Sequence, residues 1–127
     1  MEEIRLTVET QAGMTVIRIF KDRRSPTSYK EYTLSILNQE AEQRFTIPAP
    51  DDQLQNIFNA VRNARIAPMV EDEFRLHQDR YELCFNSSTK EKSYEWFCSA
   101  PQGWEPLGEI ALLLLGFAMR YAGGFFL

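Results

Sequence analysis

Apolar and polar residues alternate along several short stretches in the first half of the chain. Ile4, Leu6 and Val8 are separated by polar residues, which is the period of a strand with one buried face. Residues 29–37 and 44–47 show the same alternation, whereas residues 14–21 are apolar on both faces, which favours a central place in a sheet. The pattern therefore predicts four antiparallel strands that follow one another as a meander.

A helical period begins after residues 48–50, which contain two prolines. Asp51 and Asp52 suit a helix N-terminus, because their carboxylates accept hydrogen bonds from free backbone amides. The apolar residues that follow recur at the spacing of one helix face: Leu54, Ile57, Phe58 and Val61. We expect this helix to end at about Arg65, before Pro68, and we interpret residues 69–78 as a loop or a short strand.

A second helix is predicted near the C-terminus, with Pro106 in its first turn, where a missing amide costs little. One stripe of its apolar residues is expected to face the core: Leu107, Ile110, Leu113, Leu114, Phe117 and Tyr121. Leu112, Leu115 and Met119 widen the apolar face beyond this stripe. This excess indicates that the last helix could also support a homodimer.

Between the two helices, aromatic-rich residues 81–85 and 94–98 predict a hairpin. Matching of aromatic faces pairs Phe85 with Tyr94, Leu83 with Trp96 and Tyr81 with Cys98. Cys84 then lies on the face opposite to Cys98, which disfavours a disulfide and predicts two reduced thiols. The whole order of elements predicts a single α+β domain over residues 1–127: an antiparallel sheet, built from the meander and this C-terminal hairpin, with two helices packed on one face.

The charge balance narrows the classes of partner. The 127 residues include 14 basic and 18 acidic side chains, which gives a net charge of −4 and argues against binding to a nucleic-acid backbone. The N-terminus lacks the apolar run of a secretory signal, and residues 110–117 are too few to span a bilayer. We therefore expect a cytoplasmic protein without a membrane span.

Few residues in the sequence indicate a catalytic, metal-binding or cofactor-binding site. Spacing reveals no phosphate loop, no metal-ligand cluster and no nucleophile–base pair, so we predict no catalytic residue, no metal site and no cofactor. Three consecutive carboxylates, Glu71, Asp72 and Glu73, could present charge to a basic partner, and His77 is interpreted as a surface or hydrogen-bonded imidazole. Trp104 lies between prolines, where it is either a partner-binding anchor or a staple between this loop and the last helix.

The remaining positive charges on loops are interpreted as ordinary solvated side chains, because no exposed aromatic residues are interleaved with them: Arg23, Arg24, Lys90 and Lys92.

The segments Arg80–Phe85 and Tyr94–Cys98, followed by Pro101, Trp104 and Leu107, resemble small bacterial α+β proteins of the immunity type. The shared features are a Tyr-Glu-Leu strand, a Tyr-x-Trp strand, a proline and a closing apolar helix, over about a third of the chain. The resemblance implies a non-enzymatic protein that neutralises a cognate toxin. It carries over no functional residue, because such proteins bind their toxins through variable surfaces.

These observations lead to three hypotheses. The first is a protein-binding module, most concretely an immunity protein that blocks a toxin and whose partner is a basic toxin domain. The second is a small enzyme or ligand-binding domain whose cleft is not recognisable from sequence. The third is a structural subunit that dimerises through the last helix.

Overall fold

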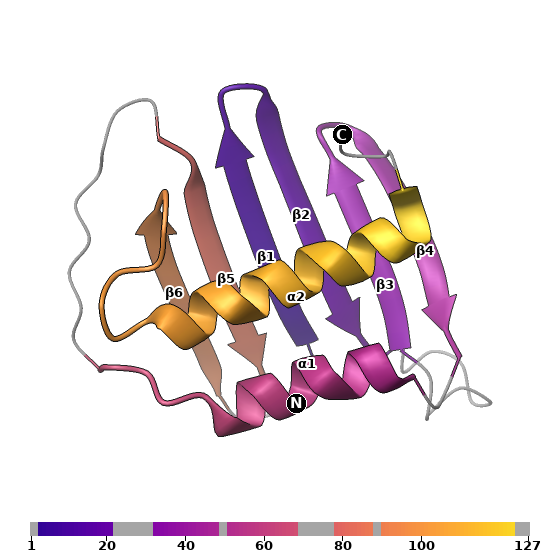
Figure 1. The fold of residues 1–127 in the computed structure, drawn as a ribbon. Helices are drawn as coiled ribbons and strands as arrows, with labels where there is room; N and C mark the ends of the chain where they lie inside the picture. The colour runs from indigo at the N-terminus through magenta and orange to yellow at the C-terminus, as the bar shows by residue number, and fades with distance from the viewer. Residues whose placement is uncertain (1–2, 22–31, 49–50, 69–77, 88–89, 124–127) are drawn as a thin grey trace.

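The computed structural model describes residues 3–21, 32–48, 51–68, 78–87 and 90–123, which form strands and helices in the order predicted for an α+β fold (Figure 1). The elements are β1 (Glu3–Thr10), β2 (Gly13–Phe20), β3 (Tyr32–Asn38), β4 (Ala41–Ile47), α1 (Asp52–Asn63), β5 (Arg80–Asn86), β6 (Glu91–Phe97) and α2 (Glu105–Ala122).

The strands form one antiparallel sheet in the order β4-β3-β2-β1-β5-β6. The first four strands are the predicted meander, and the hairpin β5–β6 continues the sheet from the free edge of β1. The central position expected for β2 is confirmed, since it lies between β3 and β1.

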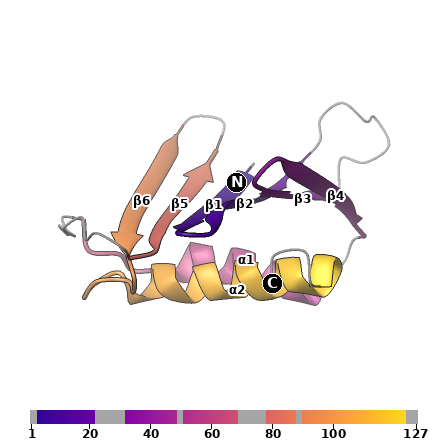
Figure 2. The same ribbon diagram turned by 90° about the horizontal axis from the view of Figure 1, so that it is seen from above.

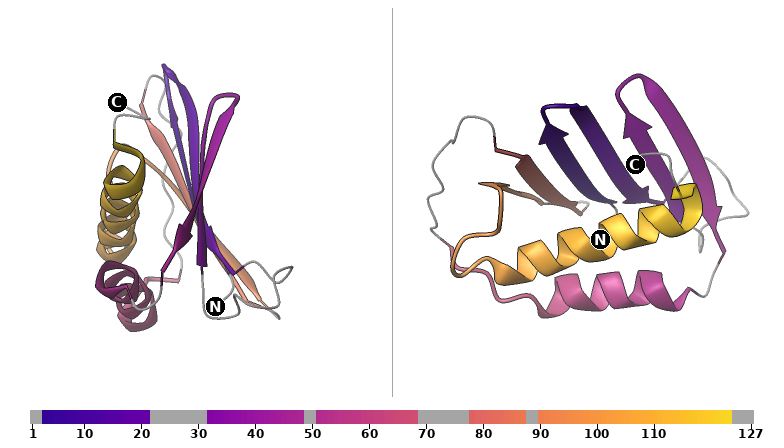
Figure 3. Two further views of the ribbon diagram at one scale, coloured as in Figure 1. Left: turned by 90° about the vertical axis from the view of Figure 1, so that its right-hand side faces the viewer. Right: turned by 45° about the horizontal axis from the view of Figure 1, so that its top comes forward.

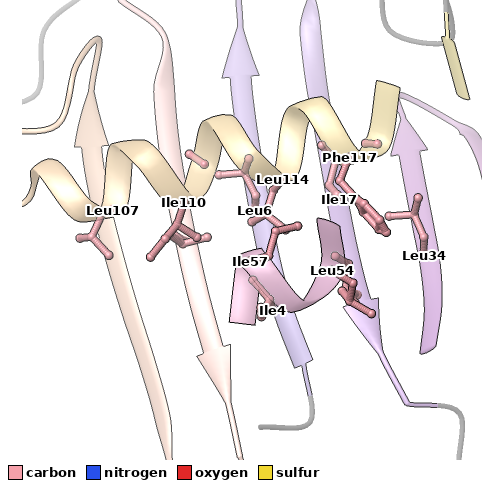
Figure 4. Packing of buried hydrophobic residues seen from close by; sticks show 14 of the residues in the cluster. Ile4, Leu6, Ile17, Leu34, Leu54, Ile57, Leu107, Ile110, Leu114 and Phe117 are labelled. Atoms are coloured by element: carbon pink, nitrogen blue, oxygen red, sulfur yellow. The ribbon is translucent and has the colours of Figure 1, made fainter. Parts of the chain in front are cut away.

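Both helices lie on one face of this sheet, as predicted (Figure 3, left). α1 and α2 run side by side in opposite directions, and α2 crosses the strands while α1 lies along one end of them (Figures 1 and 2). The core fills the space between the sheet and the two helices (Figure 4). Ile4, Leu6, Ile17, Leu34 and Leu83 from the sheet are fully buried there.

The register of the β5–β6 hairpin differs from the prediction by two residues. Leu83 pairs with Tyr94, and Tyr81 pairs with Trp96, whose ring it stacks on at 5.7 Å between centroids. The turn sets this register, because the Ser87 amide donates to the Lys90 carbonyl at 2.8 Å and closes the hairpin there. A shift of two residues leaves every side chain on its predicted face.

This register determines where the two cysteines lie. Cys84 is opposite Ser93 in β6, whereas Cys98 lies beyond the end of β6, so the expected pairing of Tyr81 with Cys98 is wrong. Cys84 is buried, Cys98 is exposed, and both are free.

Helix α1 starts where the sequence predicts and ends at Asn63, two residues before the expected end. Asp51 is its N-cap, and its side chain accepts a hydrogen bond from the Leu54 amide at 3.0 Å. Asp51 also binds α2, because both carboxylate oxygens accept hydrogen bonds from Arg120, at 2.7 and 3.4 Å. This pair therefore holds the start of α1 against the last turn of α2.

The Arg120 hydrogen bond holds the pKa of Asp51 below its ordinary value of 3.8, and the Leu54 amide lowers it further. A carboxyl with a lowered pKa stabilises the fold above its unfolded pKa, and this stabilisation is lost as the pH falls through the folded pKa. We expect Asp51→Asn, which keeps a good N-cap residue, to lower the free energy of unfolding by up to about 1 kcal/mol at neutral pH. In urea denaturation the difference from the wild type should shrink as the pH falls below 3.8.

Glu40→Gln, which removes an exposed carboxylate in the turn between β3 and β4, is the control and should change stability little. A difference between Asp51→Asn and the wild type that is constant with pH would show that the carboxylate charge is not what joins the helices.

The core-facing stripe of α2 is mostly as predicted. Leu107, Ile110, Leu114 and Phe117 are buried, whereas Leu113 and Tyr121 are only partly buried. None of the described helices is long and apolar enough to cross a membrane.

Candidate binding surfaces

The predicted site residues fall into two groups. Glu71, Asp72 and Glu73 lie outside the described residues, as does His77, for which no site role was predicted. Trp104 is described, and it lies in the core with 8% of its surface exposed.

Trp104 links three parts of the fold. Its indole N–H donates to the Ala67 carbonyl at 2.8 Å, and the Ala67 amide donates to the Gly103 carbonyl at 3.1 Å. Its ring meets the edge of Tyr94 at 5.3 Å between centroids. These contacts tie the segment after α1 to the turn before α2 and to β6. They support the staple interpretation and leave little of the ring for a partner to contact.

An apolar stripe runs along the outer side of α2. We call it the α2 stripe: Leu112, Leu115 and Met119. Leu112 is 71% exposed and Met119 is 41% exposed, although both belong to a helix whose other side is core. The spacing of three and four residues places these side chains in one row, like the seam of a coiled coil.

Two hollows of about 320 and 210 Å³ adjoin the α2 stripe, and Leu115 lines both of them. Val8 lines the larger hollow, and Tyr81 and Trp96 line the smaller one. Val8 in β1 is paired with Tyr81 in β5. The hollows are therefore neighbours along the same side of α2. They exist because the two helices leave the far ends of the strands uncovered (Figure 1).

The charges near the α2 stripe are mainly acidic. Glu105 and Glu109 are exposed in the first turns of α2, and Glu109 lies one turn before Leu112. Arg120, near the other end, is already paired with Asp51. The stripe thus combines exposed leucine and methionine side chains with a negative border.

The opposite face of the sheet, which neither α1 nor α2 covers, carries a network of paired charges. Arg18 donates to Glu3 at 3.0 Å, and Arg80 contacts Glu82 at 3.0 Å and Glu95 at 2.9 Å. These pairs hold the charged side chains of this face together within and between neighbouring strands.

Cys84 lies within that network. Only 1% of its surface is exposed, which is too little for a substrate to reach the thiol. Its Sγ accepts a hydrogen bond from Arg5 at 3.4 Å and lies 3.2 Å from the Ser93 hydroxyl. The Cys84 contact raises the pKa of Arg5. The thiol therefore acts as part of the polar packing of the sheet.

Sequence reasoning identified the leucines of the α2 stripe but missed the residues that surround them. Val8, Tyr81 and Trp96 come from three strands, and only the strand order brings them to the side of α2.

Among the described residues, no group of three or more His, Cys, Asp or Glu side chains is arranged to hold a metal ion. The chain matches no protein-family model and no curated protein.

Proposed function

We propose that this protein is a non-enzymatic binding module that blocks a protein partner, as the resemblance to toxin-neutralising immunity proteins suggests. The observation that carries the proposal is the α2 stripe, where Leu112 is 71% exposed on a helix that is otherwise anchored in the core. Exposed apolar rows bordered by charge are typical of surfaces that a partner covers.

The row and the hollows beside it favour a helix as the contacting element. Side chains spaced by three and four residues along Leu112, Leu115 and Met119 interdigitate with a second helix that has the same period. The hollows lined by Val8 and Tyr81 then receive the side chains that the incoming helix directs towards the sheet.

The acidic border selects the kind of partner. Glu105 and Glu109 attract a partner whose apolar helix is flanked by lysine or arginine, and the net charge of −4 acts in the same direction at longer range. We therefore propose a basic protein, such as a toxin domain, as the occupant of the α2 stripe.

Site-specific cross-linking in the source cells tests this proposal. A photoreactive amino acid at Leu112 should capture one basic protein, whereas the same amino acid at the exposed Gln43 of β4 should not. The captured protein, once purified, should bind the wild-type chain in a one-to-one complex, and Leu112→Glu should weaken binding at least about tenfold, which corresponds to 1.4 kcal/mol. If the partner is a toxin, the wild-type chain should relieve its inhibition of growth and Leu112→Glu should not.

Two outcomes would count against the proposal. The first is cross-linking of position 112 to a second copy of the chain, together with a purified protein that is a dimer and that Leu112→Glu converts to a monomer. This result would favour the homodimer hypothesis instead. Equal capture at Leu112 and Gln43 would show that the stripe is not an interface.

A further inference from the structure

A third hollow, of about 460 Å³, lies between the end of α1 and the β5–β6 hairpin. The twist of the sheet carries the turn end of this hairpin away from the helix layer and leaves space there (Figure 2). Val61 and Ile66 line it from α1 and the segment that follows, and Phe85 and Tyr94 line it from the hairpin. Its volume is within the range of sites that bind small molecules, roughly 300–1,000 Å³.

Three basic side chains surround this hollow, which we call the cationic hollow: Arg62, Lys90 and Lys92. None of the described residues that line it is acidic, although the chain as a whole has a net charge of −4. The described arginines of the sheet and of α2 are instead paired with carboxylates, as Arg18 is with Glu3 and Arg120 with Asp51. Three positive side chains thus gather at one hollow whose described lining holds no carboxylate.

The end of α1 opposes this charge only in part. A helix C-terminus carries a partial negative charge of about half an elementary charge. The three basic side chains together carry three positive charges, so the field at the mouth of the hollow remains positive. Arg62 itself lies in the last turn of α1, where a cation is stabilised by the same helix dipole.

One wall of the cationic hollow is aromatic and held in place. The rings of Phe85 and Tyr94 lie 6.2 Å apart between centroids and are inclined by 60°. Tyr94 is supported from behind by Trp104, and the turn of the hairpin is closed by the Ser87–Lys90 hydrogen bond. This wall therefore presents a preformed apolar surface next to Lys92, which pairs with Phe85 across the hairpin.

We propose that the cationic hollow binds a small molecule that combines a flat apolar body with a phosphate or another compact anion. The body packs between Tyr94 and Phe85 on one side and Val61 and Ile66 on the other. The anion contacts Arg62 and Lys92 at the mouth. This site is separate from the α2 stripe and does not depend on the protein partner proposed there.

A titration followed by NMR tests the site with 1-naphthyl phosphate as the probe, and with inorganic phosphate and 1-naphthol as its two halves. The complete probe should bind at least about tenfold more tightly than either half, because only it uses both the aromatic wall and the cations. The largest shifts should appear at the backbone amides of Arg62, Phe85 and Tyr94. Binding should weaken as salt is added, since the cations are exposed and screened.

The double variant Arg62→Gln/Lys92→Gln should weaken binding of the probe about tenfold, as expected for two exposed charge contacts. Arg44→Gln, which removes one exposed charge at the opposite edge of the sheet, is the matched control and should leave binding unchanged. The proposal is overturned if the double variant, shown to be folded by its unchanged NMR spectrum, binds as tightly as the wild type. It is also overturned if the probe binds no better than inorganic phosphate, or if the shifts centre on Leu112 and Leu115.

Discussion

Replacement of Phe117 with alanine is expected to lower the free energy of unfolding by about 3–5 kcal/mol, the usual cost of removing a buried phenylalanine. Phe117 is fully buried between α2 and the sheet, on the side of Ile17 and Leu34 (Figure 4), and its ring and that of Tyr121 are nearly perpendicular, with centroids 5.2 Å apart. Because domains are typically stable by about 5–15 kcal/mol, this loss is a large share of the total. Equilibrium denaturation in urea measures it directly.

Two further variants on the same helix provide the comparison. Leu112→Ala should change stability by no more than about 0.5 kcal/mol, since Leu112 is 71% exposed. Leu113→Ala should fall between the two, because Leu113 is partly buried rather than part of the fully buried row. Equal losses for Phe117→Ala and Leu112→Ala would show that α2 is rotated relative to the sheet in solution.

Periodicity predicted most of the fold because strands and helices bury different sets of positions. Ile4 and Leu6 could be buried together only in a strand, and Leu54 and Ile57 only in a helix, so element type followed directly from the apolar pattern. The placement of both helices on one face was expected from the order of the strands and helices along the chain.

The register of the hairpin could not be predicted in the same way. A shift of two residues gives Tyr94 and Trp96 different partners but keeps each side chain on its face, so the apolar pattern cannot distinguish the two arrangements. The hydrogen bond between Ser87 and Lys90 decides between them, and its geometry is not visible in the residue types alone.

The candidate sites were predicted only in part, since each depends on residues that are distant in sequence. The excess of leucine in α2 predicted an additional apolar surface, but its exposure at Leu112 depends on how α2 rests on the sheet. Lys90 and Lys92 were interpreted as solvated loop charges. Both are exposed, although Lys92 lies in β6 and not in a loop, and the fold brings them to the same hollow as Arg62, which is 28 residues before Lys90 along the chain.

Replacement of Trp104 with alanine is the second change for which we expect a large effect, a loss of about 3–5 kcal/mol of stability. The indole is 8% exposed, packs against Tyr94 and donates its N–H to the Ala67 carbonyl. Alanine would leave a cavity where the segment after α1, the turn before α2 and β6 meet. The loss should be seen in urea denaturation of the isolated protein, without any partner.

Trp104→Phe separates the two contributions of this side chain. Phenylalanine keeps most of the apolar contact with Tyr94 but cannot donate to Ala67, so it should cost about 1 kcal/mol, the typical net value of one hydrogen bond. If Trp104 were instead an anchor for a partner, Trp104→Ala would leave stability within about 0.5 kcal/mol of the wild type and would speed dissociation of the complex. The stability of the isolated variant therefore decides between the two roles that the sequence left open for this residue.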